Sequence, residues 1–360
     1  METKDSQGHK GTVSLIHNPF LVTSVSFLGA DPPACLSFMP ALIEVLKPGM
    51  LTTIQDLGRT GFQKFGVSVS GAMDFFSHRV ANRLVENDQQ AATLECTLMG
   101  PALRFLSGTM VAITGAALSP RLDGVDAAMW QSFEVRRGNV LSFGECRRGC
   151  RAYVAVAGGI DVPVVLGSRS THTRTHLGGL EGRSLQRGDI ISSLERGNNR
   201  CSTRFHSLFS ERILTSRTLR FILGPNDDHF AAASIEDLQR ETYRVSLDSD
   251  RMGIRFEGKG LTHCGGAEVV SDAVPFGTIQ VPANGQPIVL AADRQTTGGY
   301  PKVGVVITAD FPVLGQLRPG DEVRFQSISL EESLENLNSI EAAISTGYSM
   351  EGQGPEIDSH

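Results

Sequence analysis

A short pattern that occurs three times in the chain favours a fold built from β-strands. Each copy begins with an apolar residue, continues with two residues of other types and a Gly-Asp or Gly-Asn pair, and ends in a stretch where apolar and polar residues alternate. The copies are VRRGNVLSF (Val135–Phe143), LQRGDIIS (Leu185–Ser192) and LRPGDEVRF (Leu317–Phe325). A tight turn at the glycine pair that leads into a half-buried strand gives this pattern.

Helix signals are few. Asp74 is a suitable N-cap for a helix with Phe76, Val80 and Leu84 on one face, and a last amphipathic helix is expected from Leu330 to about Ile344. Because these helices do not alternate regularly with strands, a doubly wound α/β fold is disfavoured. We predict a mainly β protein with a few helices, arranged as two antiparallel β-barrel or sandwich domains.

Composition excludes several classes of protein. A chain of 360 residues with 40% hydrophobic and 20% charged residues is an ordinary globular sequence, long enough for two domains. A net charge of −6 leaves no electrostatic footprint for nucleic acid or an anionic membrane. Six scattered cysteines without a C-x-x-C pair indicate reduced thiols and a cytoplasmic location. No apolar run approaches the roughly 20 residues that span a bilayer.

Periodicity and composition also predict boundaries. Residues 1–40 lack a core pattern and are expected to be a disordered extension, so that deleting Met1–Phe38 should leave folding unchanged and Met39 is the expected native start. The remaining predicted segments are a first β domain at 43–195, a linker at 196–216, a second β domain at 217–328, a helix at 329–345 and a disordered tail at 346–360.

The densest polar segment is ADRQTTGGYPKVG (Ala292–Gly304), which separates two apolar strands. A connection that only turns the chain needs two to five residues. Glycines let backbone N–H groups approach a ligand, and a lysine supplies a compact cation, so this loop is suited to a small polar substrate with a carboxylate or carbamoyl group. Its candidate site residues are Asp293, Gln295, Thr297, Gly298, Gly299, Tyr300 and Lys302.

Four further polar clusters lie next to predicted strands. Each taken alone is most simply a solvated turn. Loops that join strand ends on one rim of a barrel meet in space, however, and we therefore expect these clusters and Lys302 to share one cleft. Their candidate substrate-binding or catalytic residues are Gln55, Asp56 and Arg59; Ser70 and Asp74; Ser168, Ser170 and Thr171; and Asp250 and Arg251.

Three better-known motifs are incomplete. The segment GIRFEGKG (Gly253–Gly260) has glycine where a phosphate-binding loop needs Ser or Thr. His172 and His176 lack a third metal ligand, so no metal site is predicted. The segment GVSVSG (Gly66–Gly71) misses the G-x-S-x-G nucleophile motif by one position.

Long stretches of the sequence resemble the KipA / allophanate hydrolase subunit 2 family. This is a biotin-dependent carboxyltransferase family that covers subdomains A and B of urea carboxylase and the C subunit of bacterial 5-oxoprolinase. The resemblance runs from Ile43 to Phe325. It is carried by TTIQDLGRTGFQKFGVSVSGAMDFFSHRVANRLV (Thr52–Val85), LECTLMGPALRF (Leu94–Phe105), RAYVAVAGGIDVPVVLGSRST (Arg151–Thr171), SDRMGIRF (Ser249–Phe256) and GTIQVPANGQPIVLAADRQTTGGYPKVGVVITAD (Gly277–Asp310).

The resemblance implies two cyclophilin-like β-barrel domains and partner proteins. The expected partners are a KipI-like subunit with carboxyltransferase subdomains C and D and a LamB/YcsF-like subunit. Together they would open 5-oxoproline to glutamate with ATP, which is used at the level of the complex. One alternative is a carboxyltransferase that moves a carboxyl group from biotin, carried on another chain, to urea or a similar amide. Another is a non-enzymatic antagonist that binds a KipI-like kinase inhibitor.

Either enzymatic reaction develops negative charge on an amide-like oxygen, which positioned donors stabilise. On this hypothesis Lys302 and Arg251 are the cationic stabilisers. Asp56 or Asp293 is the base or an orienting carboxylate, and Gln295, Thr297 and Tyr300 orient the substrate.

Overall fold

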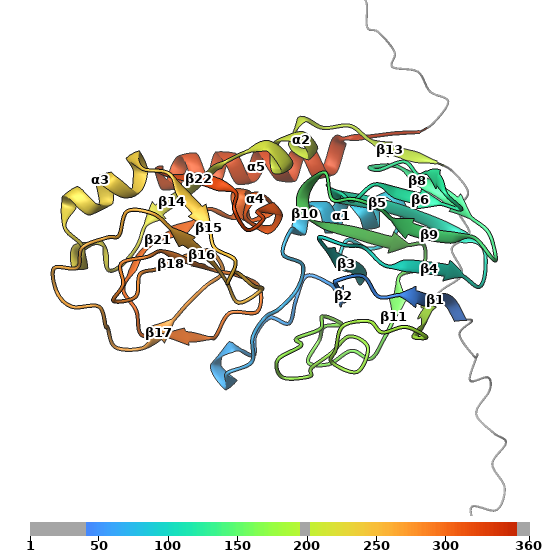
Figure 1. Cartoon of the computed structure of the whole chain (residues 1–360), viewed down its shortest axis with the longest axis horizontal. Coiled ribbons are helices and arrows are strands. Elements are labelled where there is room, and N and C mark those ends of the chain that lie inside the picture. The colour runs from blue at the N-terminus through green and yellow to red at the C-terminus, as the bar shows by residue number, and fades with distance from the viewer. Residues whose placement is uncertain (1–40, 195–201, 351–360) are drawn as a thin grey trace, which may run out of the picture. The chain divides into compact units, whose positions relative to one another are not determined.

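The computed structural model describes residues 41–194 and 202–350, and its first half consists of two β-sheets (Figure 1). One sheet has the strand order β11-β12-β1-β4-β9-β6-β7 and the other β2-β3-β10-β5-β8. The strands are β1 (Ala41–Lys47), β2 (Leu51–Gln55), β3 (Thr93–Thr97), β4 (Ala102–Phe105), β5 (Thr109–Ala117), β6 (Pro120–Leu122), β7 (Val125–Asp126), β8 (Ser132–Val135), β9 (Val140–Phe143), β10 (Arg148–Val156), β11 (Ile160–Asp161) and β12 (Ile190–Ser193).

Successive side chains of β10 point to opposite faces of the five-stranded sheet and pack in two different core clusters. Val154 belongs to a core cluster that also contains Ile43 of β1 and Phe105 of β4, so this core lies between the two sheets. The neighbouring side chain of Tyr153 points to the other face and packs in a cluster with Phe76 of helix α1 (Phe75–Leu84). Because both faces of the strand are covered, the sequence there is almost continuously apolar.

The second half contains a closed barrel with the strand order β14-β21-β18-β19-β16-β15-β22. The strands are β14 (Thr218–Leu223), β15 (Tyr243–Val245), β16 (Gly253–Glu257), β18 (Thr278–Gln280), β19 (Ile288–Leu290), β21 (Lys302–Val306) and β22 (Glu322–Ser327). The rings of Tyr243, Phe221 and Phe256 all lie within 6.4 Å of the Phe325 ring, centroid to centroid, and fill the barrel interior.

Helices and short ladders complete the described chain. The described α-helices of the second half are α2 (Leu208–Thr215), α3 (Ala232–Arg240), α4 (Phe311–Gln316) and α5 (Leu330–Thr346), and the described 3-10 helices are η1 (Gln63–Phe65), η2 (Asp227–His229) and η3 (Thr308–Asp310). Two-stranded ladders join β13 (Thr203–Phe205) to β23 (Tyr348–Met350) and β17 (Asp272–Ala273) to β20 (Thr297–Gly298).

The mainly β class is confirmed, but the architecture differs from two antiparallel barrels in detail. Only the second half is a closed barrel among the described strands, and β14 and β22 close it as a parallel pair. In the first half, the seven-stranded sheet packs on one face of the five-stranded sheet, and helix α1 and second-half elements cover its other face. A sequence pattern of short strands does not distinguish closure from stacking of two sheets.

Several predicted boundaries can be compared with the observed helices and strands. The stretch 196–216, expected to be a linker, holds β13 and α2, since Phe205 and Ile213 are buried against the first half. Helix α5 is as long as predicted and has a complete capping box at Ser329, while part of the expected tail forms β23. The predicted extension at 1–40, most of the tail and residues 195–201 lie outside the described residues. No described helix is both long and apolar enough to cross a membrane.

Candidate functional site

A buried network of charges joins the two halves of the molecule. Arg251 precedes β16 and Asp293 follows β19, and the Arg251 guanidinium donates to both carboxylate oxygens of Asp293 at 2.8 and 3.1 Å. The same guanidinium donates to Glu95 of β3 in the first half and, at 2.8 Å, to the Gly71 carbonyl oxygen. Burial lowers the pKa of Arg251, but the Asp293 and Glu95 carboxylates outweigh it and hold the pKa above its ordinary value.

The network continues through Glu95 into helix α1. The Tyr153 hydroxyl donates to Glu95 at 2.7 Å and accepts from the Asp74 backbone N–H at 2.8 Å. Asp74 caps α1 and accepts from Ser77 and, at 2.7 Å, from the Gln316 side chain of α4. Burial raises the pKa of Asp74 to about 6, against the opposing effect of these hydrogen bonds. Asp74 is therefore a structural cap as well as a predicted site residue.

A second cluster surrounds Asp56, just after β2. Its carboxylate accepts from the hydroxyls of Ser168 and Ser170 at 2.7 and 2.5 Å, and from the backbone N–H groups of Gly58 and Arg169. Burial favours a raised pKa for Asp56, but the hydrogen bonds prevail and lower it. Asp56 thus stays ionised and fixes the loop 168–170 against the end of β2.

The remaining first-half candidates lie beside this cluster. Gln55 donates to the Thr171 carbonyl oxygen at 3.0 Å, and Arg59 donates to the Ser170 carbonyl oxygen. The Ser70 backbone N–H donates to the carbonyl oxygen of Ala292, the residue before Asp293, at 3.1 Å. The structure therefore brings together the clusters around Asp56, Ser70, Ser168 and Asp293, as predicted from their positions at strand ends.

The loop that ends at Lys302 is arranged differently. Strand register places Leu290 opposite Gly253, whereas Gln280 pairs with both Ile288 and Lys302. Asp293 and Arg251 therefore lie at one end of the barrel, and Lys302 lies at the other end. Lys302 Nζ donates to Asp272 at 3.1 Å and to the Ala273 carbonyl oxygen at 3.4 Å. No described hydrogen bond or ion pair joins the Lys302 side chain to the other predicted clusters, and the single cleft that was expected to include Lys302 stays a prediction.

Other candidates in this half are also away from the buried network. Gln295, Thr297 and Tyr300 are at least partly exposed on the loop, and the partly exposed Asp250 accepts from the backbone N–H groups of Met252 and Gly253 as a turn residue. A Cβ on Gly298 would lie 2.4 Å from Gln280 Nε2, and one on Gly299 would lie 3.2 Å from Ser271 Oγ. Close packing therefore accounts for Gly298 without a ligand.

Sequence reasoning missed three central residues, Glu95, Tyr153 and Gln316. Gln316 donates to Asp74 and to the Arg151 carbonyl oxygen, and accepts from the backbone N–H groups of Cys150 and Arg151. Glu95 carried a usable signal, because it is a lone acid in TLECT, a strand whose five residues are all buried. A charged residue in such a strand needs a partner.

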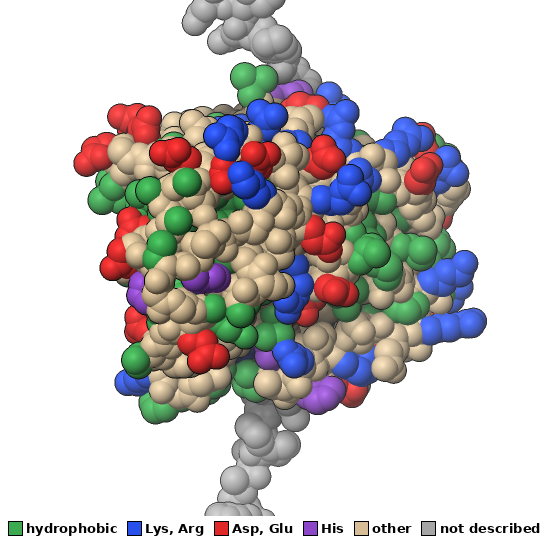
Figure 2. All heavy atoms as spheres, turned by 60° about the vertical axis from the view of Figure 1, so that its left-hand side comes forward, with side chains coloured by type: hydrophobic (Ala, Val, Ile, Leu, Met, Phe, Trp, Pro, Cys, Tyr) green, Lys and Arg blue, Asp and Glu red, His purple; other side chains and the backbone are tan. Residues whose placement is uncertain are grey.

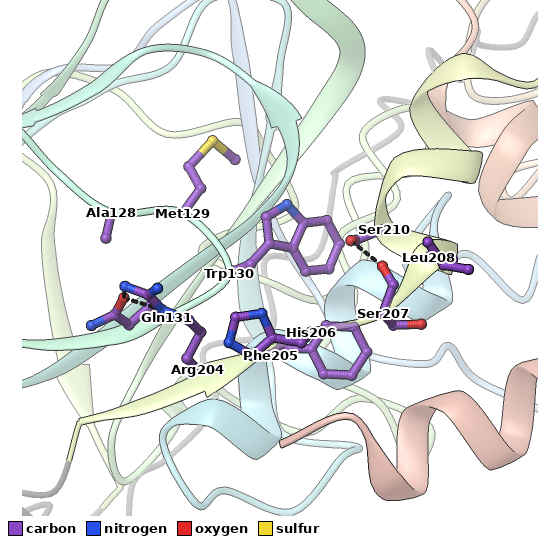
Figure 3. A pocket seen from close by; sticks show the side chains of 10 residues that line it. All are labelled: Ala128, Met129, Trp130, Gln131, Arg204, Phe205, His206, Ser207, Leu208 and Ser210. Carbon is purple, nitrogen blue, oxygen red and sulfur yellow. Dashed lines mark hydrogen bonds between the residues drawn. The ribbon is translucent and has the colours of Figure 1, made fainter. Parts of the chain in front are cut away.

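Two surface hollows lie elsewhere. One of 710 Å³ is lined by Trp130, Phe205 and His206, with Arg204 held by Gln131 at its edge (Figure 3). Another of 550 Å³ is lined by residues that include Arg79 and Arg83. None of the predicted site residues lines either hollow, so we place the candidate site at the buried junction, where the ionisable groups meet.

The structure also describes the segment that resembles a phosphate-binding loop and the possible metal ligands. Gly253–Glu257 is strand β16, so this segment is not the loop before a helix that a phosphate-binding motif requires. No group of three potential metal ligands occurs in the described ranges. On the face drawn in Figure 2, basic and acidic side chains are interspersed.

Comparison with known proteins identifies the family. A family model described as carboxyltransferase domain, subdomain A and B, matches residues 65–327. The chain belongs to this carboxyltransferase family. The resemblance seen in the sequence is thereby confirmed for most of the described chain.

The relatives fall into two groups. The chain is 40% identical to the 5-oxoprolinase C subunit of Escherichia coli, over 81% of this chain and 93% of that protein, and 38% identical to the corresponding C subunit of Haemophilus influenzae. It is 34% identical to urea amidolyase of Saccharomyces cerevisiae, of which it covers 18%. The crystal structure of the K. lactis urea amidolyase matches with a TM-score of 0.78 and 32% identity, over 85% of this chain and 20% of that one.

Proposed function

We propose that the chain is the equivalent of the C subunit in an ATP-dependent 5-oxoprolinase, which opens 5-oxoproline to glutamate. The observation that carries the proposal is the 40% identity to the Escherichia coli protein across 93% of its length. The urea amidolyase relatives are less similar, and the matching region is about a fifth of their length. The proposed partners are a KipI-like and a LamB/YcsF-like subunit, and the proposed location is the cytoplasm.

The proposed site is the junction that contains Arg251, Asp293 and Asp56. Opening the lactam adds water across a C–N bond, and negative charge grows on the carbonyl oxygen, which hydrogen-bond donors stabilise. All three nitrogens of Arg251 are already engaged, so its role is to hold Asp293 in place. Asp293 is the proposed base, and Asp56, which four donors saturate, orients the loop 168–170.

ATP is assigned to the complex. The best sequence match to a phosphate-binding loop, Gly253–Gly260, begins with strand β16 (Gly253–Glu257), which is not the loop conformation that the motif requires. The proposed division of labour puts nucleotide chemistry on a partner subunit and lactam binding at this chain's junction. We propose a positioning role for Lys302, the buried first residue of β21, and for Gln295, Thr297 and Tyr300 of the preceding exposed loop.

Reconstitution tests the function. The full-length chain is mixed with the KipI-like and LamB/YcsF-like proteins of the same organism, ATP and 5-oxoproline, and glutamate and ADP are measured. We expect ATP-dependent glutamate only when all three proteins are present. Glutamate formation that is unchanged when this chain is omitted would refute the proposal. The Arg121→Ala variant is the control, since Arg121 is exposed and its ion pair with Asp126 lies on the surface.

A carboxyltransferase is the second candidate, favoured by the TM-score of 0.78 to the K. lactis urea amidolyase. In that reaction the carboxyl group would leave N-carboxybiotin on another chain and form a C–N bond with urea or a similar amide. Transfer of labelled carboxylate from N-carboxybiotin to urea, together with absence of glutamate in the reconstituted mixture, would favour it. Partner binding without either activity would favour the antagonist.

A further inference from the structure

Arg59 is an unusual buried cation. Its side chain is among the largest that are fully buried, with the residue 1% exposed. It donates to the Ser170 carbonyl oxygen, yet no described carboxylate forms an ion pair with it, and its Nε and Nη1 have no described partner. Arginine is almost never fully buried unless it is paired, because removing a charge from water is costly. The site around Arg59 therefore favours an anion.

Ser70, on a segment adjacent to Arg59, has a second unsatisfied donor. Its hydroxyl is buried and without a described partner, and its backbone has a φ of 57°, a left-handed conformation that a non-glycine residue adopts at a cost. The Arg59 backbone N–H donates to the Val69 carbonyl oxygen at 2.8 Å, so the two segments are adjacent. Strain and an orphaned hydroxyl at one residue point to a binding role.

Close backbone packing holds the two segments together. A Cβ on Gly58 would lie 2.8 Å from Val69, and one on Gly71 would lie 2.9 Å from the Gly58 backbone nitrogen. The Ser70 backbone N–H also reaches Ala292, next to the proposed base Asp293. A ligand held by Arg59 and Ser70 would therefore lie at the junction of the two halves.

Nearby acids do not neutralise Arg59. Asp56 is saturated by four donors, and Asp293 is paired with Arg251. Burial lowers the pKa of Arg59, while the charges of Asp56 and Asp293 act in the opposite direction from beyond ion-pair distance. An added carboxylate would receive the free N–H donors of Arg59 without having to displace an existing partner.

We propose that Arg59 and Ser70 form an anchor for the carboxylate group of a small ligand. The proposal rests on the proposed function for the choice of ligand, because 5-oxoproline has a carboxylate next to its lactam ring. The anchor would hold the carboxylate while the lactam carbonyl lies toward Asp293. A neutral lactam of the same ring size would lack the group that the anchor recognises.

Calorimetric titration of the full-length chain tests the anchor with 5-oxoproline and 2-pyrrolidinone, which is the same lactam without the carboxylate. We expect 5-oxoproline to bind, and 2-pyrrolidinone to bind roughly tenfold or more weakly, the loss typical of one charge-assisted hydrogen bond. The Arg59→Gln variant should lose a similar factor for 5-oxoproline only. The Arg121→Gln variant should bind as the wild type does.

The Ser70→Gly variant keeps the test decisive if Arg59→Gln does not fold. Glycine suits a φ of 57°, so the melting temperature should not fall, whereas 5-oxoproline binding should weaken. A merely structural serine would not give these separate responses. The anchor is refuted if wild type binds neither ligand or both equally, or if both variants bind 5-oxoproline normally. Selective carboxylate binding without ATP-dependent glutamate formation would refute the proposed function alone.

Discussion

At the scale of single residues, Arg251 is the hardest to replace. It serves two carboxylates and a backbone carbonyl at once, and its removal would leave Glu95 and Asp293 buried without this cation. We expect Arg251→Ala to lower the free energy of unfolding by about 3–5 kcal/mol. Arg251→Lys should recover only part of this, because an ammonium cannot reproduce the guanidinium fork.

Urea denaturation measures the effect, with Arg121→Ala as the matched surface control. The Arg121–Asp126 pair is exposed, with side-chain exposures of 56% and 86%, so its loss should cost about 0–1 kcal/mol. A loss for Arg251→Ala no larger than that of the control would show that the junction network does not contribute to stability.

Asp74 and His78 make opposite contributions to the pH dependence of stability. Burial raises the Asp74 pKa from its ordinary value of 3.8 to about 6. The folded state therefore binds a proton there before the unfolded state does, and it gains stability as the pH falls from about 6 to 3.8. Burial lowers the His78 pKa to about 4, so the folded state excludes a proton and loses stability as the pH falls from 6.5 to 4. Each contribution is about 3 kcal/mol and they oppose each other.

Single variants should separate these contributions. Between pH 7 and pH 4, the stability of His78→Gln relative to the wild type should rise on acidification, and that of Asp74→Asn should fall. Denaturant unfolding across this pH range measures both differences, and groups common to all three proteins cancel. Slopes of the same sign for the two variants would contradict the assignment.

The sequence predicted that polar loops at strand ends lie close together, while the roles of their residues in binding or catalysis stay predictions. Asp56, Ser168, Ser170, Arg251 and Asp293 all lie at the junction, since the strand order brings their loops together. Tyr153 escaped prediction because it lies inside a strand with an apolar pattern, whereas the signal of Glu95, a lone acid in a buried strand, was overlooked. Gln316 escaped because its four hydrogen bonds join it to residues distant in the sequence, and only tertiary packing supplies them.

At the scale of elements, Lys302 is explained by the ladder between β17 and β20. Its ammonium holds Asp272 and Ala273, the two residues of β17, and β20 pairs with both of them. We expect Lys302→Ala and Asp272→Ala to reduce turnover by similar, small factors in the reconstituted assay, because each removes the same positioning contact. If Lys302→Ala alone lowered the rate by about 10²–10³, the Lys302 ammonium would instead be stabilising negative charge in the transition state, as catalytic hydrogen-bond donors do.

Local sequence signals predicted most long elements but not those that depend on tertiary contact. Helix α1 and helix α5 have strong caps and a regular apolar face, and both occur where expected. Strand β13 has only three residues and lies next to a Gly/Asn/Arg-rich segment. It forms because Phe205 packs against Phe76 and Trp130, at 5.8 and 5.9 Å between ring centroids, which no local pattern reveals.

At the scale of the whole molecule, the junction makes the two halves depend on each other. Arg251 reaches from the barrel half to Glu95, and Gln316 reaches from α4 to Asp74 and to the backbone of β10. Each of these buried polar groups has a partner in the other half, so neither half alone satisfies them. An unpaired buried donor or acceptor costs about 1–3 kcal/mol.

The wild-type chain should therefore unfold in one cooperative transition, with equal calorimetric and van't Hoff enthalpies. Gln316→Ala removes four hydrogen bonds across the junction and changes no residue of the sheet core or the barrel core. We expect its unfolding to split into two transitions, the first of them at a lower temperature than the wild-type transition. Scanning calorimetry distinguishes these outcomes, and Arg121→Ala should keep a single transition. Two resolved transitions in the wild type would show that the halves fold independently. One unshifted transition in Gln316→Ala would show that these four hydrogen bonds do not stabilise the molecule.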